Sequence, residues 1–185
     1  MSKTSFKEFV EQEKAAEDRK NSIDWEEQRK LYLKRLETLF DDVKKFLREF
    51  TESGSVQIKK KKVKIEEECI GEYEVPVLRI QIYGKYADLL PAGTNMLGTP
   101  GRVDVIGDIA TIRLILADKN EDRPQIFASF SWAKKNSKRN QEKVEDGIMR
   151  KRDYVWKIIT DPPDIRYIDL NEDSFLSALQ EVLDG

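Results

Sequence analysis

The sequence predicts an α+β fold: an N-terminal helix or helical hairpin, an antiparallel meander sheet of about five to seven strands, and a C-terminal helix packed on the sheet. Apolar residues repeat at heptad spacing in the first part of the chain, short alternating segments follow, and the chain ends in an amphipathic stretch. No helical pattern interrupts the alternating segments, which argues against a doubly wound parallel sheet. We expect a helical segment over residues 1–53 and an α+β domain over residues 54–185.

The composition limits the chemistry that the chain can perform. Its 185 residues, 39% of them hydrophobic, suffice for one core, and the charged residues nearly balance at a net charge of −2. The absence of histidine excludes Ser-His-Asp and Cys-His machinery, and the single cysteine, Cys69, excludes an internal disulfide. We therefore expect a protein without catalytic residues, metal or cofactor. No apolar run has the length of a signal peptide or a membrane span, so the expected location is the cytoplasm.

The first predicted element is a short helix that needs a partner. Ser5 is a candidate cap with Glu8 three residues later, and Thr4 is the alternative cap. Its apolar residues are Phe6, Phe9 and Val10. They cover barely two turns, which is too little apolar surface for an isolated helix.

A long amphipathic helix follows Asp24, which has Glu27 in the capping-box position. One apolar row has heptad spacing and consists of Tyr32, Leu36, Leu39, Val43, Phe46 and Phe50. A second row beside it consists of Leu33, Phe40 and Leu47. The stripe fits packing on the chain's own sheet or helix, and it fits pairing with a second subunit. Both hold if one row faces inward and the other outward.

Seven segments of the next region are predicted strands: 56–68, 74–83, 102–106, 109–117, 125–133, 148–160 and 165–170. The short connections at 106–108 and 118–124 predict hairpins. Because IATIRLILA is apolar on both faces, it indicates a central strand covered on both sides. The longest stretch without a predicted element is PAGTNMLGTPG, 91–101. It lacks the Gly-Lys-Ser/Thr ending of a P-loop, and its length makes it a candidate contact region for a ligand or partner.

The lysine run in VQIKKKKVKIEEE, 56–68, raises the choice between a polyanion-binding strip and a protected sheet edge. Residues 56–75 carry five lysines and five glutamates, so the hairpin supplies its own counter-charge. Val56 and Ile58 lie on even positions, whereas Val63 and Ile65 lie on odd ones. A regular strand cannot place both pairs on one face, so this change of apolar phase predicts a β-bulge among the lysines. Lysines and bulges protect exposed edges, and we interpret the run as an edge strand.

The C-terminal stretch DLNEDSFLSALQEVLDG predicts a helix. Asp169 with Glu172, or Asn171 alone, is its candidate cap. Its apolar face consists of Phe175, Leu176, Leu179, Val182 and Leu183. We expect this helix and the long helix to cover one face of the sheet together.

Four carboxylates are expected near strand ends: Asp88, Asp104, Asp108 and Asp118. Two or three converging carboxylates could bind magnesium for phosphoryl chemistry. However, VIGD also fits a tight turn, in which Gly and Asp serve the backbone. A magnesium-dependent enzyme is therefore the third hypothesis.

The strongest basic cluster lies between two predicted strands. Residues 134–152 carry eight basic and three acidic side chains. The basic residues are Lys134, Lys135, Lys138, Arg139, Lys143, Arg150, Lys151 and Arg152. Trp132 and Tyr154 flank the cluster and could stack on bases, whereas the alternative is a solvated loop with incidental charge.

Together these patterns predict a non-catalytic cytosolic interaction or assembly protein that acts through its N-terminal helices and sheet surface. The expected partner is another protein or a second copy of the chain. The alternative is a nucleic-acid-binding accessory protein that uses the basic cluster at 134–152.

Overall fold

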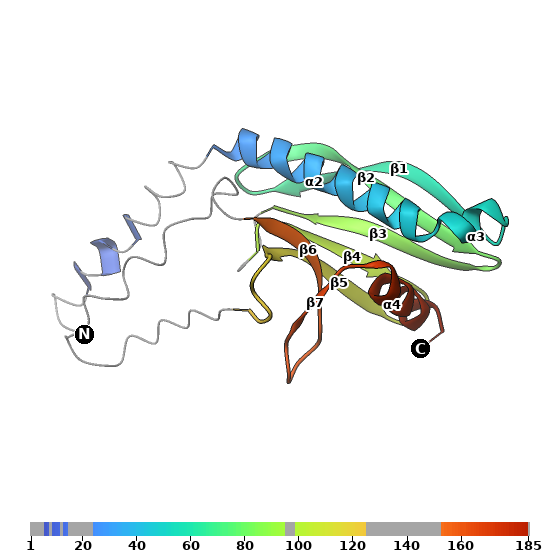
Figure 1. Cartoon of the computed structure of the whole chain (residues 1–185). Coiled ribbons are helices and arrows are strands. Elements are labelled where there is room, and N and C mark those ends of the chain that lie inside the picture. Colours follow the sequence, from blue (N-terminus) through green and yellow to red (C-terminus); the bar gives the residue numbers. More distant parts are fainter. Residues whose placement is uncertain are drawn as a thin grey trace.

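The computed structural model describes residues 6, 7, 9–11, 13, 14, 24–94, 99–124 and 153–184. The elements with defined bounds are α2 (Trp25–Phe46), α3 (Arg48–Glu52), β1 (Val56–Glu67), β2 (Gly71–Ile82), β3 (Lys85–Gly93), β4 (Arg102–Ile106), β5 (Thr111–Asp118), β6 (Tyr154–Ile159), β7 (Tyr167–Asp169) and α4 (Glu172–Asp184). Figure 1 shows a twisted sheet with α2 and α4 lying over it. The predicted α+β class is confirmed.

The sheet is a meander in which strands β1 to β7 pair in sequence order. Every neighbouring pair is antiparallel, as predicted. β5 pairs directly with β6, from Arg113 opposite Ile159 to Asp118 opposite Tyr154. The strand predicted at 125–133 and the start of the one predicted at 148–160 lie outside the described residues.

β3 was not predicted from the sequence, and part of it lies in the stretch that was expected to contain no element. Its sequence, KYADLLPAG, contains residues that are uncommon in strands. Pro91, which has no N–H to donate, lies at a register shift between Pro91 and Gly93. Such irregular positions tolerate proline, which explains why the strand continues through it.

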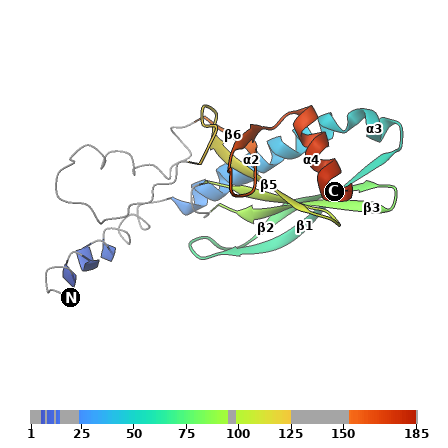
Figure 2. The ribbon, with the colours of Figure 1, turned by 90° about the horizontal axis from the view of Figure 1, so that it is seen from below.

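Both helices cover the same face of the sheet, as Figure 2 shows from a second direction. They contact each other through the rings of Phe46 and Phe175, whose centroids are 5.9 Å apart. The indole N–H of Trp156 on β6 donates to the carbonyl of Arg35 on α2 at 3.0 Å. One continuous core therefore joins α2, the sheet and α4 across the boundary expected at residues 53 and 54.

α2 begins as predicted, because the Asp24 carboxylate accepts a hydrogen bond from the Glu27 N–H at 2.9 Å. Both apolar rows pack inside the chain. Tyr32, Leu36, Leu39, Val43, Phe40 and Leu47 are buried, and Leu33 and Phe46 pack against the same core. The intrachain interpretation is therefore confirmed for α2, and an outward-facing second row is wrong. Phe50, on α3, is the one member of the heptad row that stays exposed, at 38%.

β1 is an edge strand, as predicted. Lys62 pairs with Glu74 and Lys64 pairs with Glu72 across the hairpin, at 3.2 and 2.7 Å. The expected bulge is absent from β1 and β2, since their pairing is unbroken from Val56 to Glu67. Residues 71–77 of β2 pair with β1 alone, whereas residues 78–82 also pair with β3. A two-stranded ribbon twists more strongly than a wide sheet, which is consistent with the change of phase.

α4 has Asn171 as its cap, because the Asn171 side-chain oxygen accepts a hydrogen bond from the Ser174 N–H at 3.0 Å. This settles the choice between the two predicted caps. Among the residues that the structure describes, no helix is both long enough and apolar enough to span a membrane.

Candidate interaction surface

The face of the sheet that points away from α2 and α4 presents an ordered row of side chains. Lys59 on β1 lies opposite Arg79 on β2, Arg79 opposite Asp88 on β3, and Asp88 opposite Ile106 on β4. Because side chains alternate along a strand, these four point away from the buried neighbours that face the helices. We call them the cross-strand row.

The charged residues in the middle of this face neutralise each other. Arg79 donates to Asp88 from Nε at 2.7 Å, and its second nitrogen bonds the other carboxylate oxygen. Arg102 binds Asp104 in the same two-pronged way, with both distances at 2.7 Å. Such pairs have fixed geometry, so the centre of the face is both polar and ordered.

One end of the face carries an apolar surface, the hairpin-end patch. It consists of four exposed residues, of which Tyr86 and Ile106 lie on the face and Tyr83 and Ile109 lie in the turns that end the two hairpins. They come from the β2–β3 and β4–β5 hairpins, at the C-terminal end of α2, where Val56 pairs with Ile82. Tyr86 is two residues from Asp88, the partner of Ile106, so Tyr86 and Ile106 are diagonal neighbours.

Tyr83 occupies an unusual position in this patch. It lies in the two-residue turn between β2 and β3, its φ is 52°, and 81% of its surface is exposed. A left-handed backbone favours Gly or Asn, so an aromatic residue here is strained. Strain of this kind is concentrated at functional sites, which makes the exposed ring of Tyr83 a candidate contact.

Tyr86 is held in place by its neighbour. The Arg79 guanidinium lies 5.6 Å from the centroid of the Tyr86 ring while it binds Asp88. This stacking gives an ordered pair of Tyr and Arg on an exposed surface. Tyr and Arg are enriched among the residues that dominate binding energy in protein interfaces.

Both edges of the sheet are protected against pairing with another chain. On β7, the Tyr167 N–H donates to the Asp122 carbonyl at 2.8 Å, and the Asp169 carbonyl accepts from the Ser174 hydroxyl at 2.8 Å. On β1, the lysines between Lys59 and Lys64 are exposed. Because lysines and covered backbone groups discourage strand addition, a partner is more favourably bound on the face.

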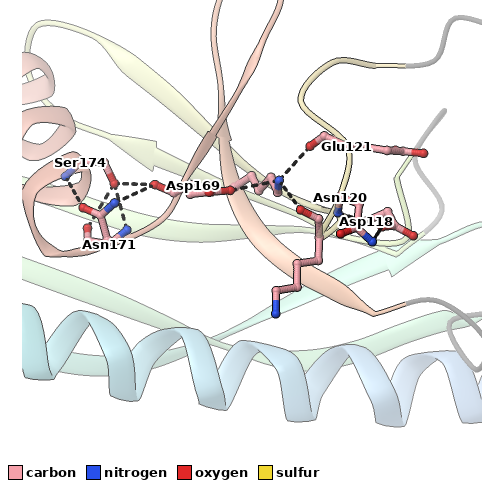
Figure 3. Close-up of polar contacts among 8 residues, drawn as sticks. Asp118, Asn120, Glu121, Asp169, Asn171 and Ser174 are labelled. Carbon is pink, nitrogen blue, oxygen red and sulfur yellow. Dashed lines mark hydrogen bonds and ion pairs between the residues drawn. The ribbon is translucent and has the colours of Figure 1, made fainter.

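At the far side of the sheet, buried Lys157 organises the connection that follows β5 (Figure 3). Its ammonium donates to the carbonyls of Lys119 and Glu121 at 2.9 and 2.8 Å and pairs with Asp169 at 3.0 Å. An ammonium has three donors, and all three are used. The Asp169 carbonyl continues the network to the α4 cap through Asn171 and Ser174.

A second polar network lies at the N-terminal end of α2. The Tyr32 hydroxyl donates to the Arg102 carbonyl at 2.7 Å, and burial raises the pKa of this phenol well above its ordinary value. Glu67 accepts from the Thr94 N–H at 2.8 Å and from the Tyr73 hydroxyl. Burial, and then this bond to Glu67, raise the pKa of Tyr73. These bonds anchor the first residues of the predicted 91–101 contact region, whose residues 95–98 lie outside the described chain.

The predicted site residues differ in where the structure places them. All eight basic residues of the 134–152 cluster lie outside the described residues. Asp88 and Asp104 are in arginine pairs, and Asp118 accepts from the Asn120 N–H at 3.0 Å. In the described part of the chain, no group of three metal-ligating side chains comes together.

The sequence reasoning missed the hairpin-end patch. Tyr83 stood at the end of a predicted strand, and Tyr86 belongs to the strand that was not predicted. The available signal was the pair Tyr83–Gly84 followed by KYADLL, since a glycine between two apolar segments indicates a hairpin. Recognising this turn would have placed Tyr86 on a strand beside it.

Comparison of the chain with protein families, with curated proteins and with solved structures finds no match.

Proposed function

We propose that this protein is a non-catalytic, cytosolic interaction module that binds another protein chain through the hairpin-end patch. The main supporting observation is the exposed, strained Tyr83 beside the stacked pair of Tyr86 and Arg79. An interface core of this kind combines apolar area with rigid polar neighbours. The protected edges favour contact through the face.

This proposal changes the role expected of the N-terminal helices. The apolar stripe of α2 is used by the chain's own core, so α2 contributes by supporting the sheet. Among the residues that the structure describes before the sheet, the exposed large apolar ones are Phe6, Phe9 and Val10 near the N-terminus, and Phe50 on α3. These residues, together with the sheet face, are the surfaces on which assembly can depend.

Affinity capture with the full chain tests the proposal, with one variant in the patch and a matched control. Ile106→Lys places a charge in the patch, whereas Ile168→Lys changes an isoleucine of similar exposure on β7, 44% against 38%. We expect the wild-type and Ile168→Lys chains to retain a partner chain that Ile106→Lys loses. Identical retention by all three chains contradicts the proposal.

Nucleic-acid binding by the basic cluster at 134–152 remains the alternative, and its support is the charge of the sequence alone. Binding of that kind weakens steeply with salt, because it depends on the release of counterions from phosphates. Salt-dependent retention on heparin by wild type and Ile106→Lys alike would favour the alternative.

A further inference from the structure

In the part of the chain that the structure describes, two apolar surfaces are exposed. One is the hairpin-end patch, and the other is formed by Phe6, Phe9 and Val10 in the N-terminal helical segment, which the structure describes at residues 6, 7, 9–11, 13 and 14. Of the large apolar residues that the structure describes as exposed, only Phe50 and Ile168 belong to neither surface. An exposed apolar surface is a mark of an interaction site, and two on one chain can satisfy each other.

The N-terminal helical segment carries an apolar stripe that ends in an acidic residue. Phe6, Phe9 and Val10 are spaced for one helix face, and the rings of Phe6 and Phe9 are 6.2 Å apart. Glu13 continues the same face, because it follows Phe9 by four residues and Val10 by three. Residues 6–14 carry two lysines and three acidic residues, a net charge of −1.

Along the cross-strand row, apolar and charged residues follow in an order that complements the N-terminal helical segment. It begins with Ile106 beside Tyr86, passes the neutral pair of Asp88 and Arg79, and ends with Lys59. Among the described residues, no ion pair involves Lys59 or its neighbours Lys60 and Lys61. The positive end of the row is therefore available to a carboxylate.

The lengths of the two surfaces also agree. Four neighbouring strands span about 14 Å, since strands lie about 4.8 Å apart. On a helix, Phe6 and Glu13, seven residues apart, are about 11 Å apart along the axis at 1.5 Å per residue. A helix lying across the strands can therefore place its apolar end on Ile106 and Tyr86 and Glu13 near Lys59.

A single chain cannot readily make this contact with itself. The patch lies at the C-terminal end of α2, and the N-terminal helical segment joins the N-terminal end of this 22-residue helix. α2 is about 33 Å long, and the path must also pass round the sheet edge to the other face. The ten Cα–Cα steps from residue 14 to residue 24 span at most about 36 Å when fully extended, which barely exceeds the length of α2 and leaves too little for the path round the sheet edge.

We infer that the N-terminal helical segment of one copy binds across the β1–β4 face of a second copy, with Phe6, Phe9 and Val10 on the partner's hairpin-end patch and Glu13 near the partner's Lys59. Two antiparallel copies make this contact twice around a two-fold axis. The inference rests on the proposed function and names its partner as a second copy of the chain.

Sedimentation velocity of the full chain over a range of concentrations tests the inference. We expect wild type and Ile168→Lys to form dimers. Phe9→Lys and Ile106→Lys should each raise the dimer dissociation constant about tenfold or more, because each disrupts the centre of both contacts. Glu13→Lys should also weaken the dimer, and Lys59→Glu combined with Glu13→Lys should restore part of the affinity.

Mixing Phe9→Lys with Ile106→Lys provides the sharper measurement. Only the mixed dimer contains one intact contact, so the mixture should associate more strongly than either variant alone. A monomeric wild type, or a dimer that neither variant affects, overturns the inference. The proposed function survives that result if affinity capture still finds a partner that depends on Ile106, and it fails if no such partner exists.

Discussion

At the scale of single residues, side chains whose hydrogen-bonding groups are all used hold parts of the sheet in place. Lys157 is the clearest case, because it is only 4% exposed and its three donors bind two backbone carbonyls and Asp169. A buried cation is costly unless it is fully paired, and here the pairing holds the turn after β5 against β6. At the other end of the sheet, the Arg79 guanidinium plays a similar part for Tyr86.

Replacing Lys157 tests this role. Lys157→Met keeps most of the side-chain volume but removes the donors, leaving two carbonyls without partners. We expect the free energy of unfolding to fall by about 2–3 kcal/mol in urea titration. Lys85→Met, which removes the exposed pair with Asp184, is the control and should cost much less. Equal losses for the two variants would show that the buried contacts of Lys157 add little.

At the scale of elements, the hairpins are the units that the sequence partly revealed. β4 was located at its observed bounds and β5 nearly so, because alternation and a Gly-Asp turn are strong local signals. β3 was not predicted, because its proline and aspartate lower strand propensity, whereas its pairing with β2 and β4 stabilises it in the sheet. The sequence shows the change of apolar phase in β1. Its structural setting depends on which residues of β2 also pair with β3, and that pairing cannot be read from a local pattern.

The turn between β4 and β5 provides a test at this scale. A Cβ on Gly107 would lie 2.1 Å from the Val182 carbonyl oxygen at the end of α4, and the Ile109 N–H donates to that same carbonyl at 3.1 Å. Gly107→Ala must therefore displace α4 or the turn, and we expect a loss of about 2 kcal/mol or more in unfolding free energy.

Gly84→Ala is the matched control for that substitution. A Cβ on Gly84 would meet no atom within 4 Å, so its unfolding midpoint in urea should stay close to that of wild type. If Gly107→Ala is equally harmless, the close approach of α4 to this turn is not a constraint on the fold.

For the whole molecule, the sequence predicted the architecture better than the site. The helix caps, the shared helix-covered face and the edge strand follow from periodicity and capping, which are local properties. The hairpin-end patch depends on which turns meet at one end of the sheet, and that is a property of the assembled meander. The absence of histidine predicted a role for the surface of the molecule rather than for a catalytic centre.

The stability of the whole molecule should depend on pH in the alkaline range. Burial, the first cause, holds the pKa of Tyr32 well above its value in an unfolded chain, about 10. Below that pH both states keep the proton, and the contribution to stability is complete. As the pH rises above about 10, the unfolded state releases the proton first, so the free energy of unfolding falls.

Urea titrations at several pH values between about 8 and 11 measure this effect. Tyr32→Phe removes the buried phenol, so its stability curve should be flatter than that of wild type above about pH 10. Tyr73 contributes in the same direction, because its pKa is also raised. A wild-type curve with no decline over this range would contradict the prediction.

The indole N–H of Trp156 donates to the carbonyl of Arg35, which lies 121 positions earlier in the sequence. This separation has a consequence for synthesis on the ribosome. The hairpins from β1 to β5 can form as they emerge, since their contacts are local. Part of the apolar stripe of α2, however, waits for β6, which is translated after β1 to β5. Until β6 emerges, this part of α2 offers uncovered apolar side chains, which chaperones bind on nascent chains.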